Sequence, residues 1–245
     1  MAENASQSVI HTLTDIPFDP DPEKLLNRVR LKAGSPDAED FLRLLERARR
    51  VARPKALYRE CYVEALGDDQ ATISGTTFHS RTLRVNLEHI GRVFPFVITC
   101  GTEMDEVALP AGDFLAPFWL DAIKEAALEA SGIHLNTRLE QRYALGKTSR
   151  MSPGSGDVSI WHIEEQRLLF GLLGDVFSAI GVSLTESCLM TPNKTVSGIV
   201  FPSEKAIRTC QVCKRENCPN RQAEFDPAAW KAIQAQETNP IILAD

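Results

Sequence analysis

Three cysteines near the end of the sequence form the group of residues best suited to chemistry. They follow the pattern Cys210-x2-Cys213-x4-Cys218-x2-Arg221. Thiolates are soft ligands that suit zinc or an iron–sulfur cluster. A fourth ligand would come from Cys188, a histidine, another subunit or a small molecule. The pattern therefore predicts a metal or cluster site at Cys210, Cys213 and Cys218, with redox-active thiols or idle thiols without a function as the alternatives.

A loop rich in glycine and serine, from Arg150 to Asp157, is a second candidate site. Glycine lets the backbone approach a ligand closely and adopt positive φ. The sequence after the loop predicts a helix, and free amides at a helix N-terminus bind anions. The Arg150 guanidinium can pair with a carboxylate in a planar fork. The spacing is not that of a nucleotide-phosphate loop, and a simple connector is the alternative interpretation.

A third candidate is a predicted hairpin in which polar residues interrupt an apolar pattern. It contains Leu184-Thr185-Glu186-Ser187, then Met190-x-Pro192 and Val196-Ser197-Gly198. This alternation would point Thr185, Ser187 and Ser197 into a cavity. An ordinary hairpin with one solvated face is the alternative. None of the five histidines stands in a recognisable motif with serine, cysteine or aspartate, so no catalytic residue is predicted.

The elements that must position these residues follow from periodicity, caps and turn residues. Helices are expected from Asp21-Pro22, after Ser35, from Ser80 to Ile90, over 114–145, over 160–180 and after Asp226-Pro227. Strands are expected over 56–66, 71–74, 93–99, 183–190 and 195–201. Strands and helices do not alternate regularly, and hairpins are mixed with long helices. The sequence therefore predicts an α+β fold, with a mainly antiparallel twisted sheet and long helices.

Three regions are expected along the chain: a flexible N-terminal arm over 1–20, an α+β domain over 21–205, and a cysteine-rich tail over 206–245 with a short C-terminal helix. The net charge of −6 and a pI near 5.5 argue against a nucleic-acid partner. No run of 18 apolar residues occurs, so no membrane partner is expected. The sparse cysteines outside the tail indicate a reducing cytoplasm rather than a secreted disulfide scaffold.

The second half of the sequence resembles the activation domain of cobalamin-dependent methionine synthase, and the cysteine-rich tail is typical of short, free-standing members of that family. Similarity extends over roughly residues 50–221 and includes a middle region, Ile98 to Asp105. Ser155 and Val200 stand where the family has an aromatic residue and a tyrosine. The matching motifs are Arg150-x-x-Pro153-Gly154, Leu184-Thr185-Glu186-Ser187, Met190-x-Pro192 and Val196-Ser197-Gly198, ending at Phe201.

The resemblance implies an accessory protein that supports reductive remethylation of cob(II)alamin, with S-adenosylmethionine as methyl donor. It implies that S-adenosylmethionine is held by Arg150, Met151, Ser152, Pro153, Gly154 and Ser155. It further implies that Thr185, Glu186, Ser187 and Ser197 face the corrinoid or line its pocket. An arginine facing the carboxylate of the methyl donor is physically reasonable.

The implied partner is a cobalamin-binding methionine synthase or another corrinoid protein, so the chain would form part of a methyltransferase system in methionine biosynthesis. A reductase or ferredoxin-type donor would supply the electron, since reducing cob(II)alamin is a one-electron step. The alternative function is non-enzymatic: a zinc- or iron–sulfur-bearing module that binds a corrinoid protein or delivers electrons to it.

Overall fold

The computed structural model describes residues 9–203, 207–218 and 221–235. Its main sheet has eight strands, and the pairings between them are antiparallel. The strands are β1 (Ile10–Leu13), β2 (Lys55–Arg59), β3 (Cys61–Leu66), β4 (Gln70–Ile73), β5 (Thr76–His79), β6 (Arg92–Thr99), β7 (Thr148–Met151) and β10 (Thr195–Pro202). The strands β8 (Ser183–Leu184) and β9 (Met190–Thr191) form a separate small hairpin.

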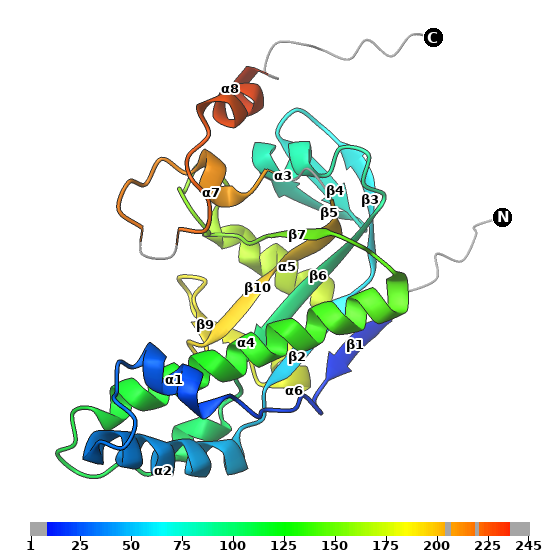
Figure 1. The fold of residues 1–245 in the computed structure, drawn as a ribbon. Helices are drawn as coiled ribbons and strands as arrows, with labels where there is room; N and C mark the ends of the chain where they lie inside the picture. Colours follow the sequence, from blue (N-terminus) through cyan, green and yellow to red (C-terminus); the bar gives the residue numbers. More distant parts are fainter. Residues whose placement is uncertain (1–8, 204–206, 219–220, 236–245) are drawn as a thin grey trace, which may run out of the picture.

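Helices cover both faces of this sheet (Figure 1). The α-helices are α1 (Pro22–Arg28), α2 (Pro36–Val51), α3 (Arg81–Asn86), α4 (Ala116–Tyr143), α5 (Gln166–Leu173), α6 (Val176–Ile180), α7 (Thr209–Val212) and α8 (Pro227–Ala235). Two short 3-10 helices, η1 (Glu103–Glu106) and η2 (Ile163–Glu165), complete the set within the described residues. The predicted α+β class, with an antiparallel sheet and long helices, is confirmed.

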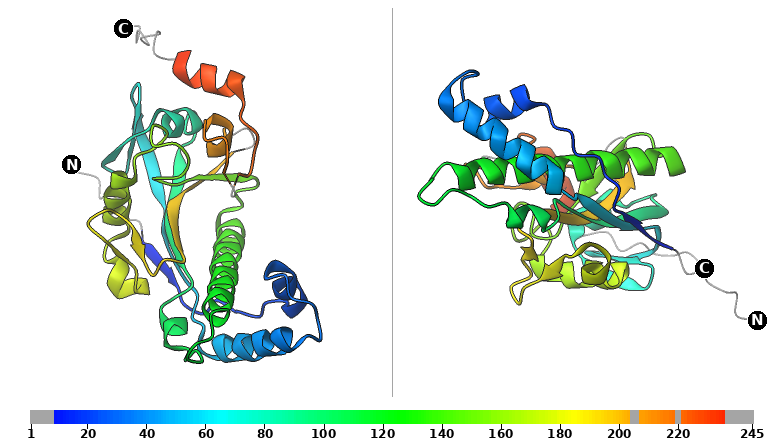
Figure 2. Two further views of the ribbon diagram at one scale, coloured as in Figure 1. Left: turned by 90° about the vertical axis from the view of Figure 1, so that its left-hand side faces the viewer. Right: turned by 90° about the horizontal axis from the view of Figure 1, so that it is seen from below.

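The central strand β6 shows why the sheet is covered on both sides. Its side chains alternate between the two faces, as the period of a strand requires. Phe94, Phe96 and Ile98 pack with Leu135 and Leu139 of α4. On the opposite face, Val97 packs with α5 and α6. Figure 2 shows α4 and the pair α5–α6 on opposite sides of the sheet.

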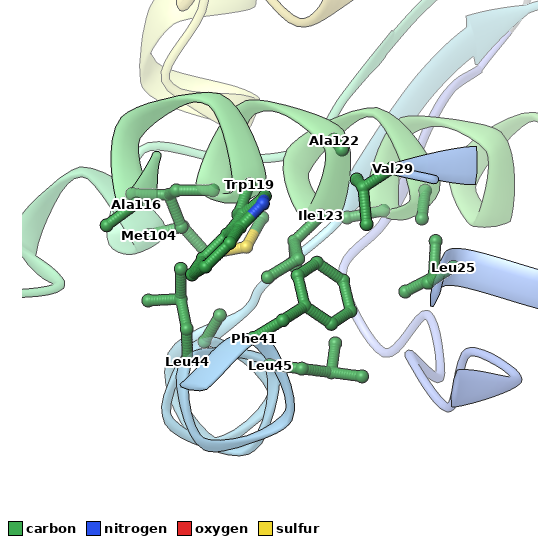
Figure 3. Close-up of a cluster of buried hydrophobic side chains, with 14 of the residues drawn as sticks. Leu25, Val29, Phe41, Leu44, Leu45, Met104, Ala116, Trp119, Ala122 and Ile123 are labelled. Carbon is green, nitrogen blue, oxygen red and sulfur yellow. The ribbon is translucent and has the colours of Figure 1, made fainter. Parts of the chain in front are cut away.

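At one end of the molecule, α1 and α2 pack against the first half of α4. Figure 3 shows this cluster, in which Phe41 and Trp119 lie close to Ile123. The rings of Phe41 and Trp119 meet edge to face, with centroids 6.1 Å apart. This arrangement suits the charge distribution of aromatic rings. It anchors α4 at one end while the other end of the helix lies on the sheet.

The four helix starts predicted at Asp21, Ser35, Ser80 and Asp226 are confirmed. The side chains of Asp21, Ser35, Ser80 and Asp226 each accept a hydrogen bond from a backbone N–H of the first turn that follows. These bonds satisfy donors that a helix leaves unpaired at its start. Gly132 does not interrupt α4, and it lies where the helix faces Ile98 of β6.

Four expectations about the elements were wrong. Ile10–Leu13 is not part of a flexible arm but pairs with β2 as an edge strand, and residues 1–8 lie outside the described part of the chain. The helix expected over 160–180 is broken at Gly174, whose φ of 74° and ψ of −140° are incompatible with a helix. The strand expected over 56–66 is divided into β2 and β3. The segment 183–190 is a strand only at its two ends.

The cysteine-rich tail is packed against the domain. Val212 of α7 and Ile233 of α8 are buried in the same cluster as Met151 and Trp161.

Across the described residues, no helix is both long and apolar enough to cross a membrane.

Candidate functional site

The strand β7 carries Arg150 and lies along β10, with Arg150 opposite Val200. Gly198 of β10 makes this close approach possible. A Cβ atom there would lie 2.4 Å from the carbonyl oxygen of Met151 and 2.7 Å from Oγ of Ser152. Any side chain at position 198 would therefore push against the backbone that leads into the glycine-rich loop.

Two amides of the loop that follows β7 are already hydrogen-bonded within the domain. The N–H of Gly154 donates to the carbonyl of Trp161 (2.9 Å), and the N–H of Ser155 donates to the carbonyl of Ser152 (3.2 Å). No helix begins directly after the loop, because the first turn is η2 at Ile163. The expectation of free helix amides next to the loop was therefore wrong, and ligand contacts through the N–H groups of Gly154 and Ser155 would compete with these bonds.

A cavity of about 530 Å³ opens between this loop, the sheet and the tail. It contains five of the six residues predicted to hold S-adenosylmethionine, and Met151 instead has its side chain buried in the core. The cavity is lined by Thr148, Ser149, Arg150, Ser152, Pro153, Gly154, Ser155, Gln166, Met190, Thr195, Val196, Ser197, Arg208, Thr209, Cys210 and Gln222.

A second cavity, of about 500 Å³, adjoins the first along α4. The two share Thr148, Ser149, Arg150 and Val196, so they are neighbours and Arg150 borders both. We call them the tail half and the α4 half of the cleft. The α4 half has an apolar part that includes Ile98, Leu128, Ile133 and Val200.

The two halves of the cleft differ in charge. The tail half is lined by Arg150 and Arg208 and by no aspartate or glutamate among the described residues. The α4 half contains Glu125 and Glu129. These carboxylates are paired, Glu125 with Lys194 at 3.7 Å and Glu129 with Arg28 at 2.7 Å. The α4 half therefore has its carboxylates already paired with cations, whereas the tail half presents positive charge without a carboxylate in its lining.

A buried glutamine holds the base of the cleft together. Gln166 accepts a hydrogen bond from Oγ of Ser197 (2.9 Å) and donates one to the carbonyl of Cys188 (2.7 Å). It thereby connects α5, β10 and the turn of the β8–β9 hairpin. Ser197 does line the cleft, as the predicted pocket role requires, but its hydroxyl is engaged by Gln166.

We expect that replacing Gln166 by leucine lowers the free energy of unfolding by about 1–3 kcal/mol, because Ser197 and the Cys188 carbonyl would remain buried without partners. Urea unfolding of the variant measures this change. Ser197→Ala and the double variant complete the cycle, and the Gln166 and Ser197 effects should not be additive. Independent effects at the two positions would contradict the interaction.

The residues predicted to face the corrinoid are divided between two places. Thr185, Glu186 and Ser187 are exposed at the tip of the β8–β9 hairpin, outside the cleft lining. The Thr185 hydroxyl accepts from the Leu189 N–H and lies 3.0 Å from the Ser187 hydroxyl, so these side chains stabilise the turn. Their role toward a corrinoid stays a prediction.

The three tail cysteines do not form a ready metal site. Within the described ranges, no group of three or more histidine, cysteine, aspartate or glutamate side chains is placed to hold a metal ion. Cys213 is buried, whereas Cys210 lines the tail half of the cleft. The Arg221 guanidinium donates to the carbonyls of Cys210 and Cys213, so Arg221 closes the cysteine loop on itself.

The cysteines differ in reactivity because some of them are buried. It raises the pKa of the Cys100 thiol to about 11, and it also raises the pKa of Cys61. At pH 8 only about one Cys100 thiol in a thousand would be ionised. We expect iodoacetamide to label the partly exposed Cys210 and Cys218 first, and Cys61 and Cys100 only after denaturation. Peptide mass spectrometry measures the order, and early labelling of Cys100 in native protein would contradict it.

Sequence reasoning missed several residues of the cleft. Arg208 was missed because the residues around it in the sequence do not show that the tail packs next to the glycine-rich loop. Glu125 and Glu129 were missed because in the sequence they look like ordinary polar positions of a long helix. Gln166 was missed because only the fold shows that it connects Ser197 with the hairpin.

Comparison with known proteins agrees with the fold. A solved structure described as the MetH reactivation domain bound to AdoHcy superposes with a TM-score of 0.57, at 17% sequence identity, covering 82% of this chain and 81% of that chain. This likeness defines the class of fold as that of a reactivation domain. No curated protein sequence matches.

A sequence comparison finds a family match over part of the chain. Residues 135–219 match the profile described as vitamin B12 dependent methionine synthase, activation domain. This region contains the glycine-rich loop, Gln166, the hairpin, β10 and all three tail cysteines. The resemblance inferred from the motifs is thereby confirmed.

Proposed function

We propose that this chain supports the reductive remethylation of cob(II)alamin held by a corrinoid protein such as methionine synthase, with S-adenosylmethionine as the methyl donor. The match of residues 135–219 to the activation-domain family supports this proposal. The AdoHcy bound to the structural neighbour supports it as well, because that molecule is the demethylated form of the donor.

The observation that carries the proposal is the cleft with Arg150 at its centre. The guanidinium has no hydrogen-bond or ion-pair partner among the described residues, and it can accept a carboxylate in a bidentate pair. From there the α4 half offers an apolar surface for a nucleoside. Glu125 and Glu129 line this half as well, each paired with a cation of the chain, Lys194 and Arg28 respectively. The residues present therefore fit S-adenosylmethionine.

The positions that depart from the family do not close the cleft. Ser155 lines the tail half, and Val200 lines the α4 half. Both are smaller than the aromatic residues that the family has there, so they leave space. In this chain the binding energy would come from Arg150 and from the apolar surface of the α4 half rather than from those rings.

Within this function, the chain binds and orients the donor. S-adenosylmethionine supplies a methyl group to the reduced cobalt of the partner, and a reductase or ferredoxin-type donor supplies the electron. We also place the activity in a reducing cytoplasm, which is consistent with the six unpaired cysteines.

The test combines the purified chain with a cob(II)alamin-loaded methionine synthase module, a reductant and S-adenosylmethionine. We expect the absorption spectrum to change to that of methylcobalamin, and only when all components are present. If neither remethylation nor a complex between the two proteins is observed, the proposal fails.

A second candidate function is a metal- or iron–sulfur-bearing module that delivers electrons to the corrinoid protein. It is favoured by one observation, that Cys210 of the tail lines the cleft. Cys210, Cys213 and Cys218 would have to come together to bind zinc or a cluster. Anaerobic purification followed by metal analysis and absorption spectroscopy tests this function. Colourless, metal-free protein that retains remethylation activity would exclude it.

A further inference from the structure

The tail half of the cleft has two walls that come from distant parts of the chain. One is the glycine-rich loop with Arg150, and the other consists of Arg208, Thr209, Cys210 and Gln222. Arg208 thus faces the same cavity as Arg150, although 58 positions separate them in the sequence.

A single buried amide fixes both walls. Asn86 of α3 donates to the carbonyl of Ile207 (2.9 Å) and accepts from its N–H (2.8 Å), as a neighbouring strand would. The same Nδ2 atom lies 3.2 Å from the sulfur of Met151. Ile207 precedes Arg208 and Met151 follows Arg150, so Asn86 connects the segments that carry the two arginines.

The contact between the walls is close. A Cβ atom at Gly156 would lie 2.7 Å from Cγ2 of Thr209, and Gly156 has a φ of 88°, so a side chain is excluded on both grounds. Val212 and Cys213 are buried directly after this contact. The tail wall is therefore a packed part of the site.

The charge of this half of the cleft is unbalanced. Neither Arg150 nor Arg208 has a side-chain hydrogen bond or ion pair with any described residue, and the lining contains no carboxylate. Guanidinium groups stay protonated at any physiological pH. Both side chains are exposed, so water screens their mutual repulsion, and an oxyanion between them would accept charge-assisted hydrogen bonds from both.

We propose that Arg208 and Arg150 form a two-arginine clamp for an oxyanion, and that the tail is thereby part of the ligand site. We assign the oxyanion as the carboxylate of the methyl donor, and this assignment rests on the proposed function. The clamp itself recognises any carboxylate or phosphate group that reaches the tail half of the cleft. Arg208 is a specificity-determining residue for ligands that carry such a group.

Calorimetry with the full chain tests the clamp. The ligands are S-adenosylhomocysteine, which carries the carboxylate, and 5′-methylthioadenosine, which shares the nucleoside but has no carboxylate. We expect Arg208→Ala to weaken binding of S-adenosylhomocysteine by about tenfold or more and to leave binding of 5′-methylthioadenosine unchanged. Arg215→Ala, at an exposed arginine of the same tail outside the cleft lining, is the matched control and should change neither.

A second arm separates failure of the clamp from failure of the proposed function. Inorganic phosphate should raise the melting temperature of the wild type and of Arg215→Ala, relative to chloride at equal ionic strength, and should raise it less for Arg208→Ala. If S-adenosylhomocysteine does not bind the wild type, the proposed donor is wrong, and the phosphate result alone decides on the clamp. If Arg208→Ala behaves as the wild type toward every ligand that binds, the clamp is excluded whether or not the donor binds.

Discussion

Gly198→Ala is expected to lower the free energy of unfolding by roughly 1–3 kcal/mol, and Gly198→Val by more, because the new side chain would collide with the backbone of β7. The distance of 2.4 Å from the added Cβ to the Met151 carbonyl cannot be relieved by rotating a side chain. The strand β7 would have to move away from β10. Arg150, the neighbour of Met151, would move with it, so ligand binding should decrease together with stability.

Gly171→Ala is the matched control for this substitution. Gly171 lies within α5, is exposed, and has nothing within 4 Å of an added Cβ atom. Alanine there should stabilise the helix by about 0.5–1 kcal/mol. Denaturant unfolding measures both variants, and a Gly198→Ala protein as stable as the wild type would show that β7 is not held against β10 as described.

The second large effect is expected from Arg150→Ala, which should weaken binding of S-adenosylmethionine by about tenfold to a hundredfold. This range corresponds to the loss of hydrogen bonds to a charged group, about 1.5–3 kcal/mol. Arg150→Lys should recover only part of the affinity, because an ammonium cannot make the planar bidentate pair. Remethylation of the partner's cobalamin should decrease in parallel at limiting donor concentration.

Lys147→Ala provides the control for Arg150→Ala, since Lys147 is an exposed cation three positions earlier and lies outside the cleft lining. Calorimetric titration of each variant compares the two positions. Equal affinities for the wild type, Arg150→Ala and Lys147→Ala would remove Arg150 from the binding site.

The features that could be predicted from the sequence are those with local causes. The caps at Ser35 and Ser80 involve a hydroxyl and an N–H three residues apart. Likewise, the apolar run of β6 and the helix-forming composition of α4 can be recognised from those segments alone. The motif around Arg150 could be found because its residues stand next to one another in the sequence.

The features that were missed depend on contacts between distant segments. β1 was taken as a loose arm because its four residues gain their hydrogen bonds only from β2, more than 40 positions later. The tail wall of the cleft depends on Asn86, whose partner Ile207 is 121 positions away. Polarity alone at position 86 does not show that the side chain is buried and connects two segments. The break of the predicted helix at Gly174 was missed because glycine within a helix costs only about 1 kcal/mol, so its presence alone does not predict a break.

The packing of the tail has a consequence for the order in which the site forms during synthesis. Domains fold as their residues leave the ribosome, N-terminal parts first. The sheet, α4 and the glycine-rich loop are complete before Arg208 and the residues after it emerge. Until then the loop has only one wall, and the cluster around Met151 and Trp161 lacks Val212 and Ile233. The cleft is therefore completed last, so a nascent or truncated chain would have much of the fold without the finished binding site.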